Sequence, residues 1–348
     1  GILTVKGGTN AIIEYFGPGA AALSCTGKAT ITNMGAELGA TTSIFPWDES
    51  MARYLRATRR AELADLAAAN ADLLQADPEV AADPRGFYDQ VIEIDLATLE
   101  PHLVGPHSPD IPHPVGRLAA DVEREGYPER ITAALIGSCT NSSYEDICRA
   151  TGIARQAVAK GLKMKASLWV SPGSDQIYET IRRDGQLAVL EQAGATVLTN
   201  ACGPCIGQWQ RDAIQQGEVN SIVTSFKSNF TKRADGNPGT HAFIVSPEVV
   251  LAYGLAGSLK FNPLTDSLTA ADGSRVKLDP PAKADELPPD GFVFSAEGYQ
   301  APPADASAVK VLVDPQSDRL ALLEPFAPWD GRDFLGLPLL IQALGKCT

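Results

Sequence analysis

The sequence predicts an α/β fold built around a mostly parallel sheet. Three apolar runs of strand length, 131–136, 166–170 and 195–199, alternate with two stretches of helical period. A strand, helix, strand, helix, strand order favours parallel strands joined by right-handed crossovers. The chain has 348 residues, which exceeds the size of a typical single core, so we expect two α/β domains and part of a third.

The composition is that of an ordinary globular protein in water. Charged residues make up 20% of the chain and hydrophobic residues 44%, and the formal net charge is -13. This acidic balance argues against a general nucleic-acid or membrane surface, so neither is expected as a partner. No apolar run is long enough to span a bilayer, and residues 1–6 lack the layout of a signal peptide. The abrupt ends lead us to expect a longer native protein.

The first hundred residues are predicted to combine short elements with packing helices. Residues 10–16 are predicted to be a helix, and residues 29–32 a short strand because of their Thr and Ile content. Asn33 and Glu37 lie four positions apart, so a helix places them on one face, although a solvated polar face is the simpler interpretation. One or two amphipathic helices are expected between residues 48 and 77.

Proline-rich stretches mark the expected boundaries between domains. Residues 84–116 are irregular and rich in proline, which predicts a domain boundary near residue 100. Residues 260–306 are rich in Pro, Asp and Gly, and they are expected to form a β-rich edge followed by a linker. Beyond them, residues 309–313 are predicted to be a strand.

Six cysteines are too few for a disulfide scaffold in a chain of this length, and they favour a metal or redox role in a reducing compartment. Cys139 comes just after the first strand of the predicted alternation, and Cys202 and Cys205 come just after the third. In a parallel sheet both loops leave the same edge, where open α/β sheets bind their ligands. We therefore expect the three thiols to lie near one another.

A fourth predicted strand, at 221–224, leads into a polar loop that reaches the same edge. The loop carries Lys227, Lys232 and Arg233. A few cations at one edge can reverse the local potential of an acidic protein and bind an anion, while a solvated basic loop is an equally simple interpretation.

Three thiolates at one sheet edge suit an iron-sulfur cubane with one iron left open. An iron without a thiolate can take water, hydroxide or substrate oxygens, and a hydroxy acid could chelate it. Other interpretations stay open at this point. Cys202 and Cys205 could form a dithiol redox pair, or all three thiols could be packing residues. A zinc site would need a fourth cysteine, Cys148, Cys25 or Cys347, to fold back.

Short motifs spread over the whole chain resemble the mitochondrial-type aconitases. They are Asn-Met-Gly-Ala-Glu at 33–37, Ile-Phe-Pro at 44–46, Gly-Ser-Cys-Thr-Asn-Ser-Ser at 137–143, the segment 200–208 around Cys-Gly-Pro-Cys, and the segments 237–243, 299–303 and 329–331. The resemblance implies three-layer α/β/α domains with mostly parallel sheets, followed by a linker. The implied division is 1–100 for the family's second domain, 101–292 for the domain with the cluster cysteines, and 293–348 for the linker and the start of a swivelling domain.

The resemblance implies a hydro-lyase that interconverts citrate and isocitrate through cis-aconitate at one 4Fe-4S cluster with an open iron. By motif, the implied cluster ligands are Cys139, Cys202 and Cys205. Asn33 is implied to lie against the cluster, Glu37 to orient a catalytic histidine from another domain, and Arg233 to pair with a substrate carboxylate.

One loop departs from the family pattern. Where the family has Asn-Arg before Asn-Phe, this chain has Lys227 and Ser228. A serine supplies neither the charge nor the fork of a guanidinium, whereas Lys227 can restore a charge as a point donor. Both residues are expected to bind substrate. Two alternatives follow: a hydratase for a homologous acid such as homoaconitate, and a non-catalytic iron-sensing relative.

The resemblance also implies the partners and the cellular location of the protein. The expected partner is a small tricarboxylate substrate, and the expected location is the mitochondrial matrix, with the cytoplasm as the alternative. The chain matches about the middle half of the family's length. The N-terminal and C-terminal domains of the same protein are therefore further expected partners, and the isolated chain is not expected to catalyse turnover.

Overall fold

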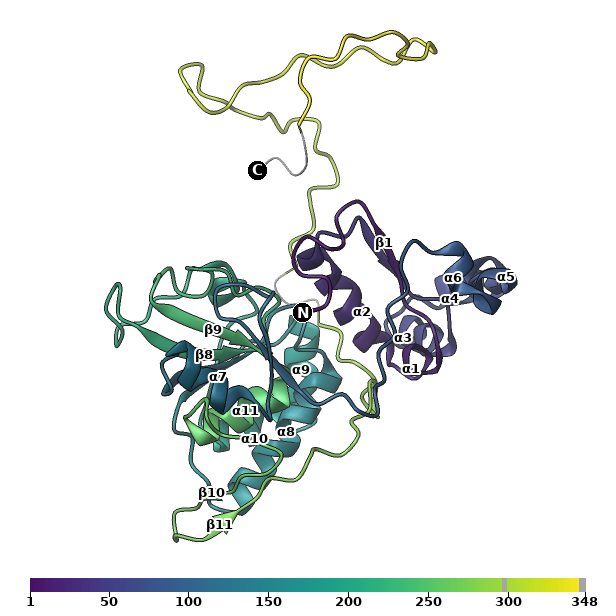
Figure 1. The fold of residues 1–348 in the computed structure, drawn as a ribbon. Coiled ribbons are helices and arrows are strands. Elements are labelled where there is room, and N and C mark those ends of the chain that lie inside the picture. Colours follow the sequence, from purple (N-terminus) through teal and green to yellow (C-terminus); the bar gives the residue numbers. More distant parts are fainter. Residues whose placement is uncertain (296–298, 344–348) are drawn as a thin grey trace. The chain divides into compact units, whose positions relative to one another are not determined.

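The computed structural model describes residues 1–295 and 299–343, and the chain divides into two units, Gly1–Ser295 and Ala296–Thr348 (Figure 1). Every helix and strand that the structure describes lies in the first unit. Within that unit, residues 102–244 form a large sheet, and the first hundred residues form short elements that contact its loops.

The sheet has the strand order β4-β3-β9-β8-β5-β6-β7. Its strands are β3 (His102–Val104), β4 (Pro112–Pro114), β5 (Ile131–Ile136), β6 (Ser167–Val170), β7 (Ala195–Val197), β8 (Asn220–Thr224) and β9 (Thr240–Ile244). The strands from β9 to β7 are parallel, while β3 pairs antiparallel with both of its neighbours. The predicted α/β fold with a mostly parallel sheet is confirmed, and the four predicted strands of this region correspond to β5, β6, β7 and β8.

Two short edge strands lie in the region that was expected to be irregular. β3 and β4 are three residues long each and pair antiparallel. β4 begins and ends on a proline, and it lies at the end of the strand order. Proline has no N–H to donate, so within a sheet it is tolerated at an edge. The proline content that predicted a loop therefore reflects an edge strand.

Helices cover one face of the sheet. They are α7 (Leu118–Glu125), α8 (Tyr144–Ala159), α9 (Asp175–Arg183), α10 (Gln186–Gln192) and α11 (Pro247–Ala256). Along β5, Ala134 and Ile136 join the large core cluster that these helices share with the sheet. The second predicted helix, 174–192, is divided into α9 and α10 at Gly185, whose φ is +85°.

The opposite face of the sheet packs against the segments that follow β7 and β8. A smaller cluster joins Ala133 and Leu135 of β5 to the residues Ile222, Phe226, Ala234 and Ala242, with Trp169, Cys205 and Trp209 packed against it. The alternation along β5 is that of a strand buried on both faces. The chain beyond Cys205 therefore covers this face.

Two predictions in the first hundred residues are wrong. Residues 10–16, expected to be a helix, contain the strand β1 (Ile12–Glu14), which pairs in parallel with β2 (Thr42–Ile44). Residues 29–32, expected to be a strand, lie inside the helix α2 (Cys25–Met34). In both places the pairing or packing partner comes from a distant segment, and such tertiary contacts outweigh local propensity.

Helix α2 is stabilised at its start and along its length. The Ser24 hydroxyl accepts a hydrogen bond from the backbone N–H of Gly27 at 3.0 Å, which caps the helix. Thr30 Oγ1 donates to the carbonyl of Thr140 at 3.0 Å. The first bond caps the helix and the second holds it against the loop that follows β5, in spite of its β-branched residues.

The remaining elements of the first hundred residues are short helices and turns. They are α1 (Pro18–Ala21), the 3-10 helix η1 (Gly35–Leu38), α3 (Glu49–Ala57), α4 (Ala61–Ala69), η2 (Ala71–Leu74), α5 (Pro78–Ala82) and α6 (Pro84–Phe87). The amphipathic helices expected between residues 48 and 77 are α3 and α4.

Residues beyond α11 form one small hairpin and then extended chain. β10 (Leu268–Thr269) pairs antiparallel with β11 (Arg275–Val276). Within 299–343 the structure describes neither helix nor strand, so the strand predicted at 309–313 is wrong. Val311 and Leu312 are 72% and 90% exposed, and a strand without a partner is not stable in water. None of the described helices is both long and apolar enough to cross a membrane.

Candidate metal centre

Three loops leave the carboxyl edge of the parallel strands and are tied to one another. The loop after β5 carries Cys139, and the loop after β8 begins at Ser225. The backbone N–H of Gly137 donates to Ser225 Oγ at 3.0 Å, and the Asn141 side chain donates to the Ser225 carbonyl at 2.5 Å. Ser171 directly follows β6, and its Oγ donates to the carbonyl of Thr199 at 3.2 Å, which fixes the loop after β7.

Cys139 is presented at the surface by a turn that its neighbours hold. Ser138 has a φ of +72°, a left-handed conformation that costs a residue with a side chain about 1–2 kcal/mol. Its own side chain accepts a bond from the N–H of Thr140 at 3.2 Å, and its carbonyl accepts one from the Ser142 hydroxyl. The Cys139 thiol is exposed and lines a pocket of about 200 Å³.

Cys202 caps one turn of 3-10 helix, η3 (Gly203–Ile206), and Cys205 lies within that turn. Pro204 opens this turn, and the N–H of Cys205 donates to the carbonyl of Cys202 at 2.6 Å. Gly207 ends the turn with a φ of +81°. Cys202 is exposed, whereas Cys205 is half-buried against the sheet face.

Electrostatics show that the sequence-predicted thiols and cations lie in one neighbourhood. Burial raises the pKa of the Cys205 thiol, the positive charge of Arg233 lowers it, and Cys202 and Cys139 raise it. Lys227 lowers it as well. The charges of these four groups therefore act on the Cys205 thiol.

Asn33 and Glu37 also meet the edge of the sheet, although they do not share one helix. Helix α2 ends at Met34, and Glu37 lies in η1. Asn33 Oδ1 accepts a bond from Thr140 Oγ1 at 3.1 Å. This places Asn33 beside the loop of Cys139.

Glu37 is held by the two residues that depart from the family pattern. Ser228 Oγ donates to the Glu37 carboxylate at 2.8 Å, and Lys227 Nζ lies 3.7 Å from the same oxygen. The Glu37 side chain is 14% exposed. The carboxylate is therefore largely buried and has both a hydroxyl and a cation as partners.

A comparison with known proteins gives the family. The sequence model of the aconitase family (aconitate hydratase) matches residues 1–257. The chain belongs to the aconitase family. Among curated aconitase-family proteins, it is 53% identical over 348 residues to a mitochondrial aconitate hydratase of Gracilaria gracilis, covering 100% of this chain and 44% of that protein. The corresponding proteins of Aspergillus fumigatus and Saccharomyces cerevisiae are 54% and 53% identical, with 43% and 44% of their lengths covered. The chain spans less than half the length of these relatives.

Membership of the aconitase family implies a 4Fe-4S cluster in general. The donor set of this chain fits such a group. Cys139, Cys202 and Cys205 are free thiols, and the positive charges of Arg233 and Lys227 oppose the rise that burial causes in the pKa of the Cys205 thiol. The Nε atom of Arg233 is buried and has no hydrogen-bond partner among the described residues, so a donor is left over for an anion.

The same residues fit a single metal ion less well. Within residues 1–295 and 299–343, no three His, Cys, Asp or Glu side chains lie close enough to hold one ion. A cubane takes each thiolate on a different iron, so its ligands need not converge on a single point. Cys148 packs against the core on α8, which removes it as a fourth zinc ligand. Cys347 lies outside the described residues.

Sequence reasoning missed the polar residues that join these loops. Thr140 and Ser225 bridge segments that are far apart in the sequence. Asn229 is buried, and its amide donates to the carbonyls of Val104 at 3.1 Å and Ala242 at 3.1 Å. The one feature of the sequence that could have identified Thr140, Ser225 and Asn229 is their position, because each lies in the loop that follows a buried strand.

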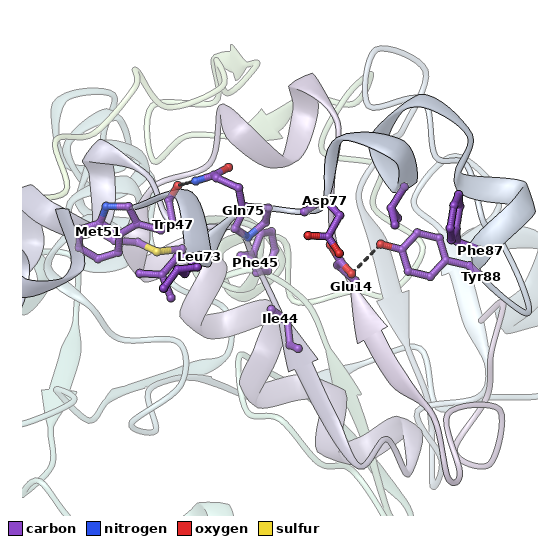
Figure 2. A pocket seen from close by; sticks show the side chains of 14 residues that line it. Glu14, Ile44, Phe45, Trp47, Met51, Leu73, Gln75, Asp77, Phe87 and Tyr88 are labelled. Atoms are coloured by element: carbon purple, nitrogen blue, oxygen red, sulfur yellow. Dashed lines mark hydrogen bonds between the residues drawn. The ribbon is translucent and has the colours of Figure 1, made fainter. Parts of the chain in front are cut away.

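A separate pocket of about 650 Å³ lies among the first hundred residues and is shown in Figure 2. Its walls include Phe45, Trp47 and Phe87, and Tyr88 donates to the Glu14 carboxylate across it at 2.6 Å. Burial and this carboxylate raise the pKa of Tyr88 to about 12. All of the lining residues fall between positions 14 and 88, and no predicted site residue is among them.

Proposed function

We propose that this chain carries the cluster-binding part of an aconitate hydratase, a hydro-lyase that interconverts citrate and isocitrate through cis-aconitate. The observation that carries the proposal is that the loops of Cys139, of Cys202 and Cys205, and of Lys227 and Arg233 follow parallel strands and leave one edge of the sheet, where hydrogen bonds fix them. Thiolates suit iron, and cations suit a substrate with several carboxylates. The names of the relatives support this activity and a place in the mitochondrial matrix, with the cytoplasm as the alternative.

Cys139, Cys202 and Cys205 are the proposed ligands of one 4Fe-4S cluster with an open iron. When bound, such a cluster supplies a Lewis acid that polarises a substrate hydroxyl. The thiols of Cys139 and Cys202 are exposed to incoming iron and sulfide, and Cys205 anchors the site to the sheet face.

Asn33 and Glu37 are proposed to act beside the cluster. The bond from Thr140 holds Asn33 next to the loop of a proposed ligand. Glu37 has a fixed orientation because Ser228 and Lys227 bind its carboxylate. An ordered carboxylate can orient a neighbouring acid or base, which the family resemblance implies to be a histidine of another domain.

Arg233, Lys227 and Ser228 are proposed to bind the substrate. The free Nε donor of Arg233 suits a carboxylate, and Lys227 offers a point charge. Ser228 is 6% exposed and donates to Glu37, so it shapes the site without adding charge. The absence of a guanidinium at position 228 favours one alternative, a hydratase for a homologous acid such as homoaconitate.

The complete activity is proposed for a longer protein. The relatives extend beyond the matched region, and we propose that N-terminal and C-terminal domains of the same protein complete the site. In this proposal residues 1–100 and 101–292 are two aconitase-like domains, and 293–348 is the linker and the start of a swivelling domain. The net charge of -13 argues against nucleic acid as a partner.

Anaerobic reconstitution of the chain with iron and sulfide tests the proposal. We expect a cluster whose absorption, and whose electron paramagnetic resonance after one-electron reduction, shift when citrate is added, without turnover by the isolated chain. Serine at any one of the three cysteines should abolish the cluster, while Cys148→Ser, the matched control, should retain it. Bound zinc without a cluster would end the proposal. A larger shift of the cluster spectrum with homoaconitate than with cis-aconitate would favour the alternative, a hydratase for a homologous acid.

A further inference from the structure

We propose that Arg211 and Asp235 form a positioning pair that fixes the loop of Cys205 against the loop of Arg233. Arg211 lies six positions after the cysteine, and Asp235 lies two positions after the arginine. The pair thus joins the proposed cluster loop to the proposed substrate loop. The effect of the pair on a bound cluster rests on the proposed function. The effect of the pair on the position of the two loops does not depend on that function.

The two loops touch first through their backbones, at Gly207. A β-carbon on Gly207 would lie 2.9 Å from the carbonyl oxygen of Lys232 and 3.7 Å from that of Arg233. Lys232 itself has a φ of +67°, and its carbonyl accepts a bond from the N–H of Gly236 at 3.1 Å. The two backbones therefore run so close together here that a side chain at position 207 would force one of them to move.

The second contact is the ion pair itself, which is almost fully buried. Arg211 Nη1 lies 3.1 Å from Asp235 Oδ2, and the two side chains are 9% and 3% exposed. The guanidinium also donates to Asn220 Oδ1 at 2.8 Å and to Thr132 Oγ1 at 2.8 Å. Asp235 Oδ2 also accepts from Thr240 Oγ1 at 2.7 Å. The side chains of Asn220, Thr132 and Thr240, which bind the pair, all belong to strands of the sheet.

These partners lie at the amino ends of three strands. Thr132, Asn220 and Thr240 belong to the first two residues of β5, β8 and β9. The cysteine loops leave the other edge of the sheet. The segment from Cys205 to Arg211 therefore runs from the carboxyl ends of the strands, where Cys205 lies, to their amino ends, where Arg211 is held.

Between those ends the segment packs closely on the sheet face. The Trp209 ring lies 5.8 Å from the Trp169 ring, centroid to centroid, at an interplanar angle of 74°. The Arg211 guanidinium carbon lies 4.9 Å from the Trp209 centroid. Trp209 and Cys205 pack against the same small cluster. A displacement of Arg211 is therefore transmitted to Cys205 through a packed side chain.

The chemistry of the pair explains why a substitution of Arg211 or Asp235 should change the position of Cys205. A buried ion pair adds little net stability, yet removal of one partner leaves an uncompensated charge that forces its surroundings to move. Lysine retains the charge of Arg211 but cannot donate to three separate acceptors in the geometry of a planar fork. Arg211→Lys is thus a mild variant that should keep the fold and loosen the loop.

Thiol alkylation of the chain without iron or sulfide tests the pair. In Arg211→Lys and Asp235→Asn, peptide mass spectrometry should show Cys205 reacting with iodoacetamide about fivefold faster than in the parent chain. Cys148, a half-buried thiol on α8, reports unfolding of the core, and its rate should not change. The control is Arg56→Lys, which alters the exposed Arg56–Asp65 pair among the first hundred residues and should leave both rates unchanged.

Two results would overturn the proposal. One is an unchanged Cys205 rate in both variants, and the other is a parallel rise of Cys205 and Cys148, which would make the pair a general stabiliser of the fold. Because no cluster is present, the result is independent of whether the chain binds one. In the reconstituted chain, Arg211→Lys should also lose cluster absorbance in air several-fold faster than the parent. Equal rates of absorbance loss in the two chains would show that the pair does not affect the cluster.

Discussion

Replacing Ser225 by alanine removes the hydroxyl that ties the Cys139 loop to the end of β8. Ser225 is 0% exposed. Its Oγ accepts from the N–H of Gly137 at 3.0 Å and lies 3.3 Å from the carbonyl oxygen of Gly137 and 3.4 Å from that of Asn141. In Ser225→Ala the Gly137 N–H stays at a buried position but loses this acceptor.

The expected loss follows from that buried donor. A buried amide left without its partner costs about 1–3 kcal/mol, and the two carbonyls lose a donor as well. We expect the free energy of unfolding to fall by about 2 kcal/mol, which for a chain of this size lowers Tm by about 3 °C.

Urea titration followed by circular dichroism, with a thermal scan, measures this loss. Ser274→Ala is the matched control, because the Ser274 hydroxyl donates to Asp272 at 2.7 Å on an exposed turn. That control should change the free energy of unfolding by less than about 0.5 kcal/mol. If the two variants unfold alike, the tie between the loops contributes nothing and the reasoning fails.

Two further substitutions test the site's backbone and the pH dependence of the fold. Gly207→Ala places a β-carbon 2.9 Å from the Lys232 carbonyl at a φ of +81°, whereas Gly217, with a φ of +85°, has open space. In parallel urea titrations the first should cost at least about 1 kcal/mol more than Gly217→Ala, and equal losses would show that the contact relaxes freely. The Arg183 guanidinium holds the pKa of Asp184 below its ordinary value, although burial opposes it. Because the folded pKa is the lower one, this stability is present above the unfolded pKa of about 4 and is lost as pH falls through the folded pKa. Asp184→Asn should therefore flatten the decline of the urea midpoint in acid, and a curve parallel to the parent's would contradict this.

The sheet could be predicted from the sequence because its strands are apolar and regularly spaced. β5 and β8 are buried almost throughout on both faces, and such strands appear as short continuous apolar runs. The carboxyl-edge position of the cysteine loops then followed from parallel topology alone. β9 lacks this signal, since it begins on Thr240 and His241 and directly follows a Pro-Gly turn.

The first hundred residues could not be predicted in the same way, because partners far along the chain determine their structure. The strand β1 exists through its pairing with β2, and the Thr30 bond to Thr140 spans 110 positions. Local propensity carries no information about such partners. The same holds for the contact of Glu37 with Ser228, which follows from no spacing rule.

The contact between Glu37 and Ser228 has a consequence for the order in which the molecule folds. It joins positions 191 residues apart, and the Gly137–Ser225 bond joins positions 88 apart, whereas β5, β6 and β7 follow one another along the chain. Contacts between distant segments carry a larger loop-closure entropy, so they form late and open first. The thiol-bearing edge should therefore be the last region to gain amide protection during refolding, after the central strands on which it is built.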